Sequence, residues 1–173
     1  AIKFNNDFKA NDFFVTPEPI IPENISRIMS LRDGNKKMSK SEDSDYTRIN
    51  LKDSSDEIIK KIKKAKTDSA PIPDNIEDLK ERAEAVNLLN IYGEITNNSS
   101  SNVLKEMSGK DFSYVKSKLS EALVDVICPI GKKIDQYMND KGFLKDVLKK
   151  GREKAIIKSE ENLKKIRDIV GFI

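Results

Sequence analysis

The sequence predicts a mainly α-helical protein, in which a helical bundle is attached to a small segment of extended chain and short strands. Apolar residues recur at spacings of three and four over long stretches, which indicates helices that bury one face. Charged residues make up 35% of the chain and hydrophobic residues 37%, which is typical of helices with narrow apolar stripes. The seven Gly and six Pro are few for an all-β protein of 173 residues.

Composition excludes several kinds of site. The single cysteine, Cys128, cannot form an intramolecular disulfide, and a chain without histidine cannot build a Cys/His zinc site. No apolar run approaches the length of about 18 residues needed to span a bilayer, so no membrane partner is expected. Without a signal-peptide pattern, a cytoplasmic location is the default expectation. The net charge of +3 is too small to indicate nucleic-acid binding by itself.

The first thirty residues contain a helical pattern followed by a proline-rich segment. Residues 2–10 place two phenylalanines four positions apart, which predicts one helical face. Residues 13–29 are apolar and contain three prolines, which prevent a regular helix. We therefore expect extended chain there, with short strands near residues 14–15 and 27–29.

A polar loop and a short helix follow. Residues 33–46 are dense in Lys, Ser and Asp, with Gly34 as the expected turn, and a short extended piece is expected at residues 48–51. Ser54 or Ser55 is the predicted cap of a helix with acidic residues in its first turn and lysines in its last. Its predicted buried stripe is Ile58, Ile59, Ile62 and Ala65. The five lysines between positions 60 and 66 are interpreted as its solvated face, with phosphate contact as the alternative.

The remaining chain predicts further helices at residues 77–95 and 102–107, and a long helix that begins after Asp111. Pro129 lies inside the long helix and predicts a kink at residues 125–128. Gly142 and Gly151 are expected to divide the C-terminal part into a short helix at 143–149 and a last helix at 152–169. The apolar positions predicted to be buried are Leu79, Ala83, Val86, Leu88 or Leu89 and Tyr92; Phe112, Val115, Leu119, Leu123, Val126, Ile127, Ile130, Ile134, Tyr137 and Met138; and Ala155, Ile156, Leu163, Ile166 and Ile169 or Val170.

The sequence Lys37-Met38-Ser39-Lys40-Ser41 (KMSKS) carries the clearest chemical signal. It presents two ammonium groups three residues apart and two hydroxyl groups, beside the turn-forming residues 33–35. Mobile lysines and serine hydroxyls on a loop suit the binding and release of a polyphosphate. On composition alone, an ordinary solvated Lys/Ser loop would look the same.

KMSKS resembles the second signature of class I aminoacyl-tRNA synthetases. The longer pattern RIMSL…KKMSKS, followed by KKIKKAKTDS and NLLNIY, is similar to the bacterial-type tryptophanyl-tRNA synthetase family from about Phe13 onward. The resemblance implies that residues 1–52 are the C-terminal edge of a Rossmann-like catalytic domain, with the KMSKS loop at 33–46. It implies a helical domain of the anticodon-binding type at residues 53–173.

The resemblance also implies a reaction, in which ATP activates tryptophan and the amino acid passes to tRNA-Trp. It implies an ATP site that includes Lys37, Met38, Ser39, Lys40, Ser41 and Ile28. Lys37 and Lys40 are its expected catalytic, phosphate-contacting cations, and Mg²⁺ is expected to bind through the ATP phosphates rather than through protein ligands. The backbone near Met38 and Ile28 is expected to border the adenine.

Absence of histidine means that the first signature of the class, of HIGH type, is not in these residues. We therefore expect the chain to be the C-terminal part of a longer, homodimeric enzyme and to be inactive alone. The alternatives are a free-standing helical RNA-binding module and the corresponding part of a tyrosyl-tRNA synthetase. Candidate base-contacting side chains are Tyr92, Tyr114, Tyr137 and Arg82, although each tyrosine could equally belong to the core.

Overall fold

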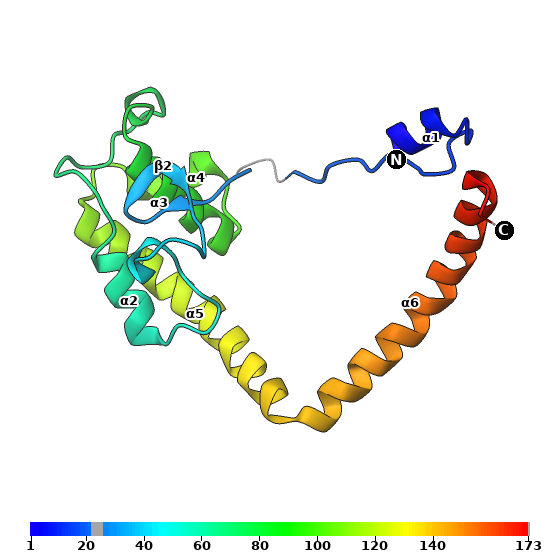
Figure 1. Cartoon of the computed structure of the whole chain (residues 1–173). Helices are drawn as coiled ribbons and strands as arrows, with labels where there is room; N and C mark the ends of the chain where they lie inside the picture. Colours follow the sequence, from blue (N-terminus) through cyan, green and yellow to red (C-terminus); the bar gives the residue numbers. More distant parts are fainter. Residues whose placement is uncertain (22–25, 173) are drawn as a thin grey trace. The chain divides into compact units, whose positions relative to one another are not determined.

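A computed structural model describes residues 1–21 and 26–172 and confirms the predicted mainly α-helical fold. The chain forms two compact units, one of Ile21–Asp135 and one that combines Ala1–Ile20 with Gln136–Ile173. The larger unit contains a β-hairpin and helices α2 to α4, together with most of α5 (Figure 1). The functional division into residues 1–52 and 53–173 stays a prediction.

The hairpin consists of β1 (Met29–Ser30) and β2 (Asp33–Lys37), which pair antiparallel. The strand expected at 27–29 therefore begins two residues late. The first part of the expected loop is strand β2, and residues 48–51 form no strand. Part of the expected extended segment, residues 22–25, lies outside the described residues.

Helix α2 (Ser55–Lys63) begins as predicted. Ser54 Oγ accepts from the Glu57 amide, while the Glu57 carboxylate accepts from the Ser54 amide at 2.8 Å, so the two residues form a capping box. Ile58 and Ile62 are fully buried, whereas Ile59 is only half-buried. The apolar stripe therefore turns α2 toward the core.

The helix predicted at residues 77–95 is interrupted. A 3₁₀ turn, η2 (Glu77–Leu79), precedes α3 (Ala83–Thr96), because Arg82 leaves helical geometry at φ −113° and ψ 64°. Asn97, at φ 54°, ends α3 in the left-handed conformation that asparagine tolerates. Buried side chains of α3 include Leu88 and Tyr92, as predicted.

Helices α4 (Ser100–Met107) and α5 (Phe112–Asn139) complete the core. The α5 helix begins after Asp111, whose carboxylate accepts from the Tyr114 amide at 2.9 Å. The apolar stripe of α5 is buried only as far as Gly131. Pro129 lies within the helix, and a kink there stays a prediction. Four residues predicted to be buried are exposed instead: Val126, Ile130, Tyr137 and Met138.

The smaller unit contains α1 (Ile2–Asp7) and α6 (Lys141–Val170). No strand forms at residues 14–15, because the Asn5 side chain pairs with the backbone of Phe14 at 2.9 and 3.0 Å. The predicted break at Gly151 is wrong, since α6 is continuous. A helical glycine costs only about 1 kcal/mol, which a long helix tolerates. The burial predicted for Ala155, Ile156, Leu163, Ile166 and Ile169 or Val170 is also wrong, since no residue of α6 is buried.

Candidate phosphate-binding loop

The β-hairpin that carries KMSKS is fastened to α3 by Asn87. The buried Asn87 amide accepts from the Met29 backbone N–H at 2.9 Å and donates to the Met29 carbonyl at 2.9 Å. A side-chain amide has both a donor and an acceptor, so it can replace the missing strand partner of β1. This fixes the base of the hairpin on the helical core.

Gly34 has a different role from the turn expected in the sequence. It lies in β2, where an added Cβ would be 2.5 Å from the Ala83 carbonyl carbon and 2.6 Å from the Glu84 amide nitrogen. Glycine is therefore required for the close approach of β2 to the start of α3, not for a turn. The nearby Lys66–Glu84 ion pair, at 2.7 Å, joins the segment that follows α2 to the start of α3.

Backbone and hydroxyl contacts shape the signature itself. The Met38 amide donates to the Ile28 carbonyl at 3.0 Å, so the two residues expected to border adenine lie side by side. Met38 is half-buried against the core. Ser39 Oγ lies 2.8 Å from Ser41 Oγ and accepts from the Ser41 amide at 3.2 Å. The two hydroxyls therefore close a local turn around Lys40.

Lys37 and Lys40 both have exposed side chains. Among the described residues, no carboxylate lies within ion-pair distance of either ammonium group. The signature thus combines a fastened backbone with two cations that remain available to an anion. The structure brings Lys37, Met38, Ser39, Lys40, Ser41 and Ile28 together at one end of the hairpin.

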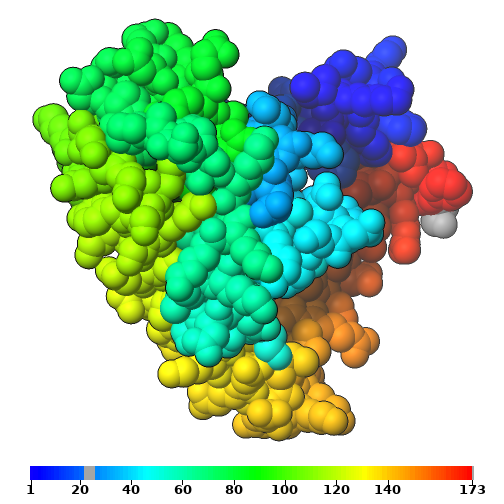
Figure 2. Space-filling model, turned by 90° about the vertical axis from the view of Figure 1, so that its left-hand side faces the viewer, coloured from blue at the N-terminus to red at the C-terminus, as the bar shows by residue number. Residues whose placement is uncertain are grey.

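The residues after the signature are held by Arg48. Its guanidinium donates to the Glu42 carbonyl at 2.9 Å and pairs with the Asp45 carboxylate at 2.9 Å. We refer to residues 42–47, which this side chain holds, as the downstream arm. The arm ends in the 3₁₀ turn η1 (Asp45–Thr47). Figure 2 shows this part of the chain (cyan) lying against α2 (blue-green).

Lys61 of α2 makes an ion pair with the arm, and the Lys64 ammonium at the end of the helix lies 4.4 Å from the centre of the Tyr46 ring. The Lys61 ammonium group pairs with Asp45 and, at 2.6 Å, with the buried Asp53 carboxylate. Lys61 is itself buried, so the solvated-face interpretation is wrong for this lysine. Burial alone lowers the pKa of Lys61, but the hydrogen bonds that its ammonium donates to Asp45 and Asp53 raise the pKa above its ordinary value overall. The hydrogen bond from Lys61 is also the main reason that the pKa of Asp45 is lowered.

The candidate RNA-contacting residues separate into two pairs. Arg82 forms a bidentate pair with Asp68 at 2.7 and 2.9 Å and donates to two backbone carbonyls as well. Tyr92 is buried and donates to Glu106 at 2.9 Å, and its burial and this bond raise the pKa of Tyr92 to about 12. Tyr114 and Tyr137 are exposed, and the Lys110 ammonium lies 5.3 Å from the centre of the Tyr114 ring.

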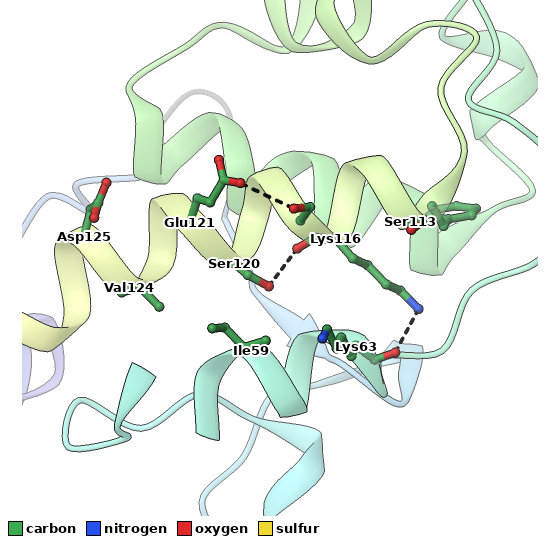
Figure 3. Close-up of a pocket in the computed structure, with 10 residues that line it drawn as sticks. Ile59, Lys63, Ser113, Lys116, Ser120, Glu121, Val124 and Asp125 are labelled. Carbon is green, nitrogen blue, oxygen red and sulfur yellow. Dashed lines mark hydrogen bonds between the residues drawn. The ribbon is translucent and has the colours of Figure 1, made fainter. Parts of the chain in front are cut away.

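A groove of about 910 Å³ separates α2 from α5 (Figure 3). Lys116 points across it and donates to the carbonyls of Lys63 and Ala65 at 3.3 and 2.8 Å, which satisfies the C-terminal end of α2. Because this ammonium is used within the protein, it is a helix cap rather than a free anion ligand. Among residues 1–21 and 26–172, no cluster of three acidic, Cys or His side chains could hold a metal ion.

The sequence model of the family described as tRNA synthetases class I (W and Y) matches residues 1–126. The chain belongs to this family. In the described part of the chain, no helix is both long and apolar enough to cross a membrane.

The individual relatives of this class I synthetase chain described next are both named tryptophan–tRNA ligase. A tryptophan–tRNA ligase of Caulobacter vibrioides is 44% identical over 172 residues, which are 99% of this chain and 50% of the relative. One from Rickettsia felis is 43% identical over 157 residues, or 91% of this chain and 47% of the relative. The chain spans about half the length of the curated relatives it matches.

Solved structures match this family member over the same extent. The tryptophanyl-tRNA synthetase of Mycoplasma pneumoniae has a TM-score of 0.81 at 26% identity, covering 100% of this chain and 53% of that structure. The enzyme from Campylobacter jejuni has a TM-score of 0.60 at 22% identity, covering 99% and 50%, and shows the shared fold alone. The predicted family and fold class are confirmed, while the roles of the individual signature residues stay predictions.

Proposed function

We propose that this chain supplies the ATP- and pyrophosphate-contacting loop and the tRNA-binding helices of a cytoplasmic tryptophan–tRNA ligase. The observation that supports the loop assignment is the exposure of Lys37 and Lys40, without carboxylate partners in the described part of the chain, on a backbone fastened on both sides. The relatives that span the chain are named tryptophan–tRNA ligases, which favours tryptophan over tyrosine as the amino acid.

The proposed chemistry is electrostatic. When tryptophan attacks the α-phosphate of ATP, negative charge builds on the departing pyrophosphate, and cations fixed near it lower the barrier. Lys40 and Lys37 are the proposed catalytic cations, and Ser39 and Ser41 exchange their mutual hydrogen bond for bonds to phosphate oxygens. Mg²⁺ is proposed to bind through the ATP phosphates, and the backbone at Met38 and Ile28 to border the adenine.

The proposal assigns residues 1–52 to the edge of the catalytic domain and residues 53–173 to the tRNA-binding part. The 173 residues contain no histidine, so a HIGH-type signature must come from elsewhere in the enzyme, and the tryptophan site is proposed to lie there as well. Alone, the chain is therefore proposed to be inactive and to bind ATP weakly, since most contacts are unmade. The complete enzyme is proposed to be a homodimer.

For tRNA-Trp, the exposed Tyr114 with Lys110 is the best-supported contact. An aromatic ring beside a cation suits stacking of an unpaired base and attraction of its phosphate. Arg82 and Tyr92 are better explained as structural residues, because their polar atoms are already bonded within the protein. Tyr137 is exposed but packs on Phe143, with ring centres 5.2 Å apart.

The test is a chimaera in which this chain replaces the matching half of the Caulobacter vibrioides enzyme. We expect tryptophan-dependent exchange of pyrophosphate into ATP, reduced about 100-fold by Lys40→Ala, the scale observed for loss of one transition-state charge contact. Lys80→Ala, which changes an exposed lysine of the same unit, is the matched control. A folded chimaera whose exchange activity is unaffected by Lys40→Ala would refute the assigned role, and a tyrosine-dependent exchange would favour the tyrosyl alternative.

A further inference from the structure

The downstream arm meets α2 at two charged groups, the Lys64 ammonium, which lies 4.4 Å from the centre of the Tyr46 ring, and the Lys61 ammonium, which makes an ion pair with the arm. The Lys61 side chain is only 6% exposed, yet its ammonium reaches Asp45, whose side chain is 53% exposed. A buried lysine is costly unless its charge is paired, and Asp53, which is 7% exposed, supplies the permanent partner. Asp45 is thus a second, solvent-accessible partner of a charge that the core already holds.

Lys61 can act on the loop because its own position is fixed. It lies in α2 three residues after the fully buried Ile58, and the Asp53 carboxylate that pairs with it also accepts from the Asn50 amide at 2.8 Å. Helix α2, the preceding residues 50–53 and the Lys61 ammonium group therefore form one rigid support. A group held in this way can orient a flexible segment without itself being reordered.

The arm is held at Asp45, whereas the lysine side chains of the signature are free of ion pairs in the described residues. Asp45 bonds to Arg48, Asn50 and Lys61, whereas Lys37 and Lys40 have no ion-pair partner in the part of the chain that the structure describes. Four residues separate Lys40 from the anchored Asp45. Fixing Asp45 therefore limits the positions that Lys40 can sample.

We propose that Lys61 is a positioning residue for the phosphate-binding loop, which it holds through Asp45. This inference rests on the proposed function of Lys37 and Lys40. The tether reduces the conformational entropy that the loop must lose when it closes on a polyphosphate, so it strengthens binding without touching the ligand. Lys61 thus links helix α2 to the signature by a direct ion pair.

The test begins with amide hydrogen exchange of the full chain without ligand. In Asp45→Ala we expect exchange at residues 38–44 to rise about fivefold, as expected for loss of one partly exposed ion pair, while the α2 and α5 amides are unchanged. Asp43→Ala, an exposed aspartate of the same arm for which no ion pair is present among the described residues, is the matched control. Equal exchange in the two variants would overturn the proposal.

A double-mutant cycle assigns the effect to Lys61. We expect Lys61→Met to raise exchange in the arm, and Asp45→Ala to add little in that background because the partner is already lost. Additive effects of the two substitutions would show that Asp45 acts through Arg48 or Asn50 and would overturn the role of Lys61. Lys61→Arg keeps the charge and should restore slow exchange in the arm.

Titration with magnesium pyrophosphate separates this inference from the proposed function. We expect pyrophosphate to slow exchange at residues 38–41 in the unmodified chain, and Asp45→Ala to weaken its affinity about fivefold relative to Asp43→Ala. Equal affinities would contradict the positioning role. If pyrophosphate slows exchange in none of the proteins, the proposed function fails, and the exchange measured without ligand still decides whether Lys61 holds the arm.

Discussion

Lys61 Nζ lies 2.6 Å from Asp53 Oδ2, and the two side chains are only 6% and 7% exposed. The pair joins Asp53, just before α2, to Lys61 in the last turns of the helix, and Lys61 also pairs with Asp45 of the downstream arm. Burial of both charges requires each to keep its partner, since a lone charge in the core is strongly destabilising.

Asp53→Ala is therefore expected to lower the free energy of unfolding by about 3 kcal/mol, because it leaves the Lys61 ammonium with one exposed partner. The measurement is urea denaturation followed by circular dichroism. Asp56→Ala is the control, because Asp56 lies exposed in the first turn of the same helix and should contribute only about 0.5 kcal/mol through the helix dipole. Similar losses for both variants would show that the buried pair adds nothing specific.

Gly34→Ala tests the close approach of β2 to α3. An added methyl group would lie 2.5 Å from backbone atoms that cannot rotate away, so we expect a loss of about 3 kcal/mol in unfolding free energy. Gly109→Ala is the comparison, because Gly109 has a positive φ of 72° but open space around it. It should cost only about 1 kcal/mol, the strain of a left-handed alanine. A Gly34→Ala loss no greater than this would contradict the packing argument.

Local signals in the sequence predicted much of the fold correctly. The Ser54 cap and the acidic first turn gave the start of α2, and Asp111 gave the start of α5. Gly151 was misleading, because the cost of one glycine does not end a long helix. The turn predicted at Gly34 is also wrong, since a glycine needed for close packing of a strand against a helix looks identical in sequence to one needed for a turn.

The candidate site was only partly predictable, because sequence patterns show motifs but not contacts between distant segments. The KMSKS lysines are recognisable as a motif, but the contacts of Lys61 and Asn87 depend on segments distant in the chain. A signal for Lys61 did exist, since it lies three residues after Ile58 and therefore on the buried face of α2. The neighbouring lysines nevertheless make a solvated face the simpler interpretation of this segment.

Tyr92 predicts a loss of stability at alkaline pH. Its pKa is about 12 in the folded protein, because of burial and the bond to Glu106, against 10.0 as its ordinary value. The unfolded chain therefore releases this proton first, and the contribution of Tyr92 is full below pH 10.0 and is lost as pH rises toward about 12. The expected loss is about 2 kcal/mol.

The measurement is the free energy of unfolding between pH 9 and pH 12, in the unmodified chain and in two variants. Tyr92→Phe should remove this part of the pH dependence, while Tyr114→Phe, which alters an exposed tyrosine, should keep it. Because the lysines titrate over the same range in all three proteins, the difference between curves isolates Tyr92. An identical slope for Tyr92→Phe and the unmodified chain would contradict the raised pKa.

Lys37 and Lys40 are proposed to bind the phosphates of ATP and of pyrophosphate. Titration of the isotope-labelled chain with magnesium pyrophosphate, followed by backbone amide NMR shifts, tests this claim most directly. We predict saturable shifts concentrated at residues 37–41, which Lys40→Ala abolishes and Lys118→Ala leaves unchanged. Shifts spread over the lysine-rich surface of α6, or a response at residues 37–41 that survives loss of both signature lysines, would contradict the claim.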